Sequence, residues 1–262
     1  MEPVVTRPLV VGNWKMNLDY VEAVHLTQQI GVILKNKPLE HVELVVVPPF
    51  VDLRSVTSVV ESERIAVGVG AQHASRHEAG AHTGEVSVSM LQRLNVAWVL
   101  VGHSERRAMY AMTDVVVAQT LRTVLGQGLN GVLCVGEELS IREAGRQDDF
   151  VTAQLHAALE GLDETSRPLV TIAYEPIWAI GSGLTATTEQ VREMTEHIRT
   201  VASSLSLGQV RVLYGGSVNA ENAASLMTEG RVDGFLVGGA SLKAESFLTI
   251  SQAANDCYDG KR

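Results

Sequence analysis

Short runs of valine, leucine and isoleucine recur along the chain, and a segment with helical spacing of apolar residues follows each of them. Near-continuous apolar runs of this length are typical of parallel strands that are buried on both faces. The pattern predicts eight strands, at Leu9–Val11, Val42–Val47, Ile65–Val69, Val96–Val101, Gly131–Val135, Leu169–Ala173, Val210–Leu213 and Gly234–Val237.

The segments between these runs predict helices. Val21 and Ile30 belong to an apolar side of the first one. Thr187 and Gln190 have the spacing of a capping box at the start of a later helix. Asn219 stands where the residue that caps the seventh helix is expected.

Eight strands that alternate with helices define an α/β protein. In a chain of 262 residues, eight repeats favour a closed (β/α)8 barrel, with residues 1–262 as a single domain, over an open doubly wound sheet. The chemistry of such barrels lies at the C-terminal ends of the strands. The residues that follow each predicted strand are therefore the candidates for function.

Composition and charge narrow the possible functions. The net charge of −9 argues against a nucleic-acid partner and against an anionic membrane surface. The sequence has no apolar run of 18 residues, and its first residues lack the charged and then apolar layout of a signal peptide. We therefore expect a soluble, cytoplasmic protein, in which any anionic substrate must be held by local donors.

The two cysteines, Cys134 and Cys257, form no C-x-x-C pair, and no cluster of histidine and cysteine is present in the sequence. This pattern predicts neither a disulfide nor a metal site.

Polar, titratable and glycine residues gather after the predicted strands. They follow the first, fourth, sixth, seventh and eighth strands and are, in chain order, Asn13, Lys15, His103, Glu105, Glu175, Gly181, Ser217, Gly238 and Gly239.

The segments after the seventh and eighth strands are the usual place for a phosphate in a (β/α)8 barrel. Ser217, Gly238 and Gly239 lie there, and glycines let backbone N–H groups approach an anion closely. Gly181 is predicted to reach the same anion, and Lys15 supplies a full positive charge. The pattern predicts a phosphate-bearing substrate.

Glu175 and His103 have the chemistry of proton transfer beside a carbonyl group. A carboxylate becomes a stronger base when water is excluded from it. His103 precedes a predicted helix start, where the helix dipole disfavours the imidazolium form, so a neutral ring is expected to polarise the carbonyl by hydrogen bonding.

The segment AYEPIWAIGSGLTA (residues 173–186) also permits an alternative interpretation, in which it forms a dinucleotide-binding site. Gly181, Gly183 and Ala186 match the G-x-G-x-x-A fingerprint of dinucleotide-binding folds. That motif requires its first glycine directly after the strand, whereas residues 175–180 intervene here. We favour instead a stiff hinge followed by a lid tip at residues 179–183, which would close over Glu175.

The chain resembles the triosephosphate isomerase family over about residues 8 to 250. The matching motifs are NWKMN at 13–17, GAxTGEVS at 80–87, VGHSERR at 101–107, LCVGE at 133–137, AYEPIWAIGSG at 173–183, YGGSVN at 214–219 and LVGGASLK at 236–243. The resemblance implies a TIM barrel, no cofactor, and a place in glycolysis and gluconeogenesis.

The resemblance also implies residue roles. Glu175 is similar to the family's base, His103 to its electrophile, and Lys15 to its electrostatic substrate-binding residue, with Asn13 and Glu105 beside them. By the same resemblance, Gly181, Ser217, Gly238 and Gly239 form the phosphate cradle, and Trp178 meets Glu137. The reaction implied is the interconversion of dihydroxyacetone phosphate and D-glyceraldehyde 3-phosphate.

A homodimer through residues 72–85 is also implied. The alternative is the same aldose–ketose chemistry on a four-carbon sugar phosphate, because one extra methylene is only weakly discriminated by binding. The sequence departs from the family at Leu184, Met112, His73 and His82, positions expected to affect the lid and the dimer more than the reaction type.

Overall fold

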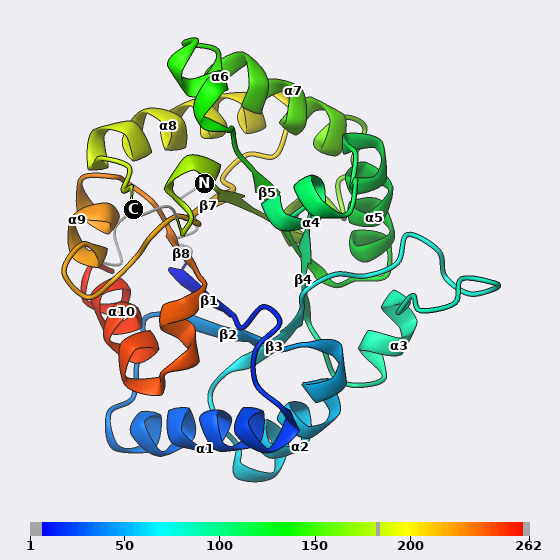
Figure 1. Cartoon of the computed structure of the whole chain (residues 1–262), viewed down its shortest axis with the longest axis vertical. Helices are drawn as coiled ribbons and strands as arrows, with labels where there is room; N and C mark the ends of the chain where they lie inside the picture. Colours follow the sequence, from blue (N-terminus) through cyan, green and yellow to red (C-terminus); the bar gives the residue numbers. More distant parts are fainter. Residues whose placement is uncertain (1–6, 182–183, 259–262) are drawn as a thin grey trace.

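The computed structural model describes residues 7–181 and 184–258, and within them the eight predicted strands form one closed barrel (Figure 1). All neighbouring strands are parallel, and β1 pairs with both β2 and β8. The strands are β1 (Leu9–Asn13), β2 (Glu43–Val47), β3 (Gly68–Ala71), β4 (Trp98–Val101), β5 (Asn130–Val135), β6 (Val170–Tyr174), β7 (Arg211–Tyr214) and β8 (Gly234–Val237). The predicted (β/α)8 barrel is confirmed.

Helices surround the barrel on its outside (Figure 1). They are α1 (Tyr20–Asn36), α2 (Leu53–Glu63), α3 (Val88–Gln92), α4 (Ser104–Met109), α5 (Asp114–Gly126), α6 (Leu139–Glu143), α7 (Gln147–Leu159), α8 (Thr188–Ser204), α9 (Ala223–Thr228) and α10 (Ala244–Asp256). Over residues 7–181 and 184–258, four short 3-10 helices accompany them: η1 (Phe50–Asp52), η2 (Arg167–Leu169), η3 (Ile177–Ala179) and η4 (Gly239–Leu242).

The predicted capping box is confirmed, since the Thr187 hydroxyl accepts from the Gln190 amide and the Gln190 side chain accepts from the Thr187 amide. The predicted cap at Asn219 is wrong in its position. Asn222 directly precedes α9, and the Asn219 side chain instead accepts from the backbone of Glu221 and Asn222. Asn219 therefore fixes the turn before the helix.

The third strand begins later than the predicted Ile65–Val69, at Gly68. Arg64 ends α2 in the left-handed conformation, and the Ile65 amide donates to the carbonyl of Val60 at 3.0 Å. Ile65 thus belongs to the end of the helix. Its apolar side chain is buried against α1 at Gly31, so burial alone did not distinguish helix end from strand.

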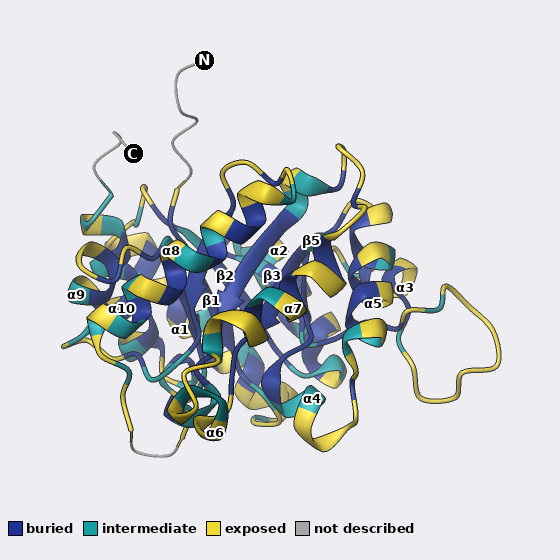
Figure 2. Ribbon diagram, turned by 90° about the horizontal axis from the view of Figure 1, so that it is seen from above, coloured by how far each residue is buried: buried dark blue, intermediate teal, exposed yellow. Residues whose placement is uncertain are grey.

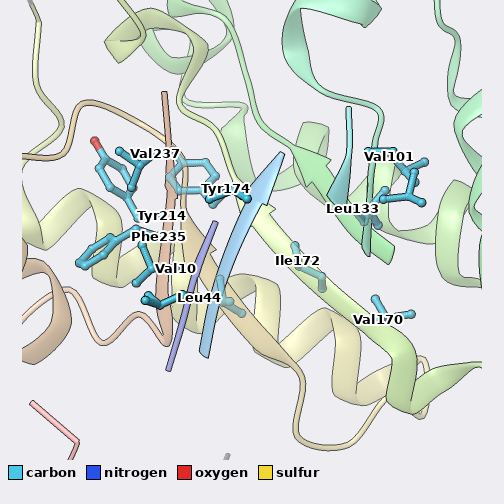
Figure 3. Packing of buried hydrophobic residues seen from close by; sticks show 14 of the residues in the cluster. Val10, Leu44, Val101, Leu133, Val170, Ile172, Tyr174, Tyr214, Phe235 and Val237 are labelled. Carbon is cyan, nitrogen blue, oxygen red and sulfur yellow. The ribbon is translucent and has the colours of Figure 1, made fainter. Parts of the chain in front are cut away.

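The core has two layers, because alternate residues of a strand point to opposite faces. In β1, Leu9 and Val11 face the barrel interior, whereas Val10 packs toward the helices. Figure 3 shows Val10 and Ile172 among the side chains of this second layer. In Figure 2 the buried strands lie at the centre and the exposed residues on the outer helices and loops.

Among the residues that the structure describes, no helix is long and apolar enough to cross a membrane. Cys134 is a buried thiol outside any disulfide.

Closure between β1 and β8 depends on Gly234. Gly234 pairs with Leu9 and has a φ of 141°, and a Cβ placed on it would lie 1.9 Å from the Leu9 carbonyl oxygen. We expect Gly234→Ala to lower the free energy of unfolding by about 3 kcal/mol or more, because strain and overlap combine. Urea unfolding measures this loss.

The control is Gly126→Ala at the exposed end of α5, where an added Cβ meets nothing within 4 Å. That substitution is expected to raise stability by about 0.5–1 kcal/mol. Equal stability of the Gly234→Ala variant and the wild type would contradict the role given to Gly234.

Candidate active site

Glu175 directly follows β6, and its carboxylate lies inside the rim of the barrel with 2% of the residue exposed. Its Oε1 is 3.1 Å from Nε2 of His103, and its Oε2 accepts a hydrogen bond of 2.9 Å from the backbone N–H of Ser104. Two polar contacts therefore offset part of the cost of burying this carboxylate.

His103 caps the first turn of α4. Its Nδ1 accepts from the backbone N–H of Glu105 at 3.3 Å. A nitrogen that accepts a hydrogen bond carries no proton, so a neutral His103 ring holds its proton on Nε2, the atom that faces Glu175. The ring is thus oriented to donate a hydrogen bond toward the middle of the site.

Lys15 follows β1 in a left-handed backbone conformation, with φ of 53°. The Asn13 side chain accepts from the Lys15 amide at 3.0 Å, and the Gln72 side chain donates to the Lys15 carbonyl at 2.6 Å. Such a conformation is unfavourable for a non-glycine residue and persists only when its surroundings hold it. The Lys15 Nζ then lies 2.6 Å from Oε1 of Glu105.

The glycine-rich rim forms the other side of the site. Gly238 ends the turn after β8, its carbonyl accepts from the Ser241 hydroxyl at 2.6 Å, and η4 begins at Gly239. The Ser217 hydroxyl donates to the Ala179 carbonyl at 2.8 Å. A Cβ on Gly238 would touch the Lys15 side chain at 3.4 Å, so lysine and glycines face one another.

One cavity of about 300 Å³ joins these groups. Eight of the nine predicted residues line it, namely Asn13, Lys15, His103, Glu175, Gly181, Ser217, Gly238 and Gly239. The ninth, Glu105, contacts the lining through its ion pair with Lys15.

Glu137 is buried beside this cavity and holds the first part of the predicted lid. Its Oε1 accepts from the Trp178 indole at 2.9 Å and from the Tyr174 hydroxyl at 3.0 Å. Burial and then the charge of Glu137 raise the pKa of Tyr174 far above its usual range. The contact between Trp178 and Glu137 is confirmed.

Residues 182 and 183 of the predicted lid tip lie outside the described residues. The 3-10 helix η3 lies between β6 and Gly181. The first glycine is therefore not in the turn directly after the strand, as a dinucleotide site requires.

Two of the departures from the family, His73 and His82, lie in the protruding segment between β3 and α3 (Figure 1), and a third, Met112, lies between α4 and α5. His73 is buried, and burial followed by the charge of Arg106 lowers its pKa to about 4. Met112 is packed into the core. His82 is exposed and stacks on His77 with the ring centroids 3.9 Å apart.

Sequence reasoning missed three groups that support the site. The Ser104 amide is a backbone donor, which no side-chain pattern reveals. Gln72 was only one polar residue among several after its strand. Gln154 did carry a signal, because it is a polar residue on the apolar face of α7 between Val151 and Leu155.

A barrel with this rim defines a class of protein. A buried carboxylate faces a histidine at one end of the cavity, and a lysine faces backbone glycines at the other. These are the parts of an enzyme that moves protons on a small anionic substrate.

Comparison with known proteins identifies the family. A family model described as triosephosphate isomerase matches residues 8–254. The triosephosphate isomerase of Corynebacterium efficiens is 45% identical over 97% of this chain and 99% of its own length. Those of Nocardia farcinica and Saccharopolyspora erythraea are each 46% identical over 95% of this chain and 97% of theirs. The chain belongs to the triosephosphate isomerase family and is an isomerase.

Gly215 leaves room for the carboxylate of Glu175. A Cβ on Gly215 would lie 2.9 Å from Cγ of Glu175 and 3.3 Å from the Tyr174 carbonyl oxygen. If Glu175 is the base that the sequence predicts, Gly215→Ala is expected to lower kcat by about tenfold or more, because small displacements of a reacting group are costly. Steady-state kinetics tests this expectation, with thermal unfolding to verify that the variant is folded. A folded variant with wild-type kcat would contradict it.

Proposed function

We propose that Glu175 is the base, and His103 the electrophile, in the interconversion of dihydroxyacetone phosphate and D-glyceraldehyde 3-phosphate. The observation that carries this proposal is the 3.1 Å approach of Glu175 to Nε2 of His103 within the cavity that the glycine rim lines.

The steps follow from the positions of the atoms. Glu175 removes a proton from the carbon next to the carbonyl group, while Nε2–H of His103 donates to the carbonyl oxygen. The product of this step is an enediolate, with the charge on the former carbonyl oxygen rather than on carbon. Glu175 then returns its proton to the former carbonyl carbon, while the hydroxyl proton of the first carbon is transferred to the charged oxygen through Nε2 of His103. The first carbon thereby becomes the new carbonyl group, and the product is the other triose phosphate. No oxidant, reductant or leaving group is involved.

The rest of the cavity suits the charged part of this substrate. Ser217, Gly238 and Gly239 are proposed to bind the phosphate through backbone N–H groups, with Gly181 approaching from the lid. Lys15 balances the phosphate charge, and Asn13 and Glu105 hold that lysine in place through the contacts already described. A (β/α)8 barrel commonly binds phosphate after its last two strands.

Glu175→Gln tests the base. The variant keeps the shape of the side chain but cannot accept the proton, so kcat is expected to fall by at least about 10³-fold while the fold remains. A coupled assay with glyceraldehyde 3-phosphate measures the rate. Glu164→Gln, which changes an exposed carboxylate, is the control and is expected to match the wild type. A Glu175→Gln variant with a tenth of wild-type activity would rule out this role.

We also propose that residues 1–262 form one cytoplasmic domain that pairs as a homodimer through residues 72–85. Exposed apolar side chains support a partner of this kind. They lie on the segment after β1, on η1, on α3 and at the end of α4, and they are Met16, Val51, Met90, Met109 and Tyr110. Contiguous exposed apolar surface is typical of an interface.

Met16→Glu tests the dimer. Met16 is 93% exposed in the single chain, and a carboxylate that a partner covers without pairing is costly to desolvate. The dimer dissociation constant is expected to rise by about a hundredfold or more, as measured by sedimentation equilibrium. Val32→Glu, on the outer side of α1 with 56% exposure, should leave it unchanged. Equal dissociation constants in both variants would contradict this interface.

A further inference from the structure

Gln154 is a polar residue on the buried face of α7, and both polar atoms of its side-chain amide form hydrogen bonds with Gly136. Its Oε1 accepts from the N–H of Gly136 at 2.9 Å, and its Nε2 donates to the C=O of the same residue at 3.3 Å. Gln154 is 5% exposed. Burying an amide among apolar side chains costs free energy unless it is hydrogen-bonded, and Gly136 supplies both bonds.

The direction of the β5 backbone explains why Gly136 needs such a partner. The carbonyl of Val135 accepts from the Glu175 amide at 2.7 Å, and that of Glu137 accepts from the Ile177 amide at 3.0 Å. These two carbonyls therefore face β6. Backbone groups alternate between the two edges of a strand, so the polar groups of Gly136 face the opposite edge.

On that opposite edge the neighbouring strand has already ended. The last residue of β4, Val101, pairs with Leu133, three residues before Gly136. The backbone beyond that point has no strand to bond, and the Gln154 side chain occupies the position of the missing partner. It is the equivalent of one further residue of β4, supplied by a helix.

Gly136 in turn touches the candidate base. A Cβ on Gly136 would lie 1.8 Å from the carbonyl oxygen of Glu175 and 3.2 Å from its Cα. The next residue, Glu137, accepts the hydrogen bonds of Trp178 and Tyr174. A displacement of Gly136 thus reaches both the main chain of Glu175 and the carboxylate that holds the start of the lid.

We propose that Gln154 is a positioning residue for the isomerisation: it fixes the end of β5, and through Gly136 it sets the positions of Glu175 and Glu137. This inference rests on the proposed role of Glu175 as the base. Gln154 itself does not line the cavity, so it acts through the backbone and not on the substrate.

Gln154→Met is the test, because methionine has a similar length and makes neither hydrogen bond. We expect kcat to fall by about ten- to a hundredfold, since a shift of the base by a fraction of an ångström to 1 Å has effects of that size. KM is expected to stay within about twofold of wild type, because three of the proposed phosphate-binding residues, Ser217, Gly238 and Gly239, follow β7 and β8 rather than β5.

A spectroscopic measurement separates positioning from a general loss of stability. The chain has three tryptophans, so 5-fluorotryptophan labelling gives a simple fluorine NMR spectrum, with Trp178→Phe to assign one resonance. In Gln154→Met the Trp178 resonance is expected to shift as Glu137 moves, while those of Trp14 and Trp98 stay in place.

Ser251→Ala is the matched control. Ser251 is also buried, and its hydroxyl donates to a backbone carbonyl within α10, that of Phe247 at 2.8 Å. This variant loses a buried hydrogen bond far from β5, and it is expected to keep wild-type kcat and an unshifted Trp178 resonance.

Wild-type kcat in Gln154→Met, or a loss of kcat with Trp178 unshifted, would overturn the proposal. So would an equal loss of kcat in Ser251→Ala. Gln154→Glu keeps an acceptor for the N–H of Gly136 and is expected to retain more kcat than Gln154→Met. If the methionine variant does not fold, Gln154→Glu carries both measurements. It lacks the donor to the Gly136 carbonyl, so a smaller loss of kcat with a shifted Trp178 resonance is expected, and wild-type kcat with an unshifted Trp178 resonance would overturn the proposal.

Failure of the base assignment gives a different result. An active Glu175→Gln variant would remove the role of Glu175, whatever Gln154 does. An inactive Glu175→Gln variant together with a fully active Gln154→Met variant would leave the base in place and remove only the positioning role.

Discussion

The burial of one carboxylate is the constraint on which the rest of the site depends. Glu175 is 2% exposed, and an ionised group withdrawn from water is costly unless other groups replace its hydration. The Ser104 amide and His103 supply two such groups from the start of α4. Both come from the segment after β4, two strands away from β6. These contacts therefore form only when β4, β5 and β6 pair in the correct register.

That dependence explains why the strand ends are reinforced from outside the sheet. Parallel strands of unequal length leave backbone groups without partners at the rim, and buried groups of this kind require hydrogen bonds. Gln154 meets this need at Gly136, and the Arg107 guanidinium meets it at the carbonyl of Cys134 at 3.3 Å. Side chains of the surrounding helices thus hold the strand ends rigid at the rim, where the candidate active-site residues are attached.

The sequence predicted the fold because buried parallel strands leave a strong apolar pattern, and it predicted the polar rim because barrel chemistry lies after the strands. It failed where several structures share one pattern. Ile65 is apolar because it ends a helix against α1, and Asn219 holds a turn rather than capping α9. The sequence did not predict the supporting contact from Ser104 for another reason, since the donor there is a backbone N–H and leaves no side-chain pattern.

The ion pair of Lys15 and Glu105 places a positive charge at the rim of a chain whose net charge is negative. A chain with a net charge of −9 repels an anion at long range, so attraction must be local. Lys15 provides it, although it is ion-paired with Glu105. The side chains of that pair are 27% and 39% exposed, and partly solvated ion pairs contribute only about 0–1 kcal/mol. Glu105 can therefore orient the lysine without competing strongly with the doubly charged phosphate of the proposed substrate, for which the proposed backbone N–H donors lie on the opposite side of the cavity.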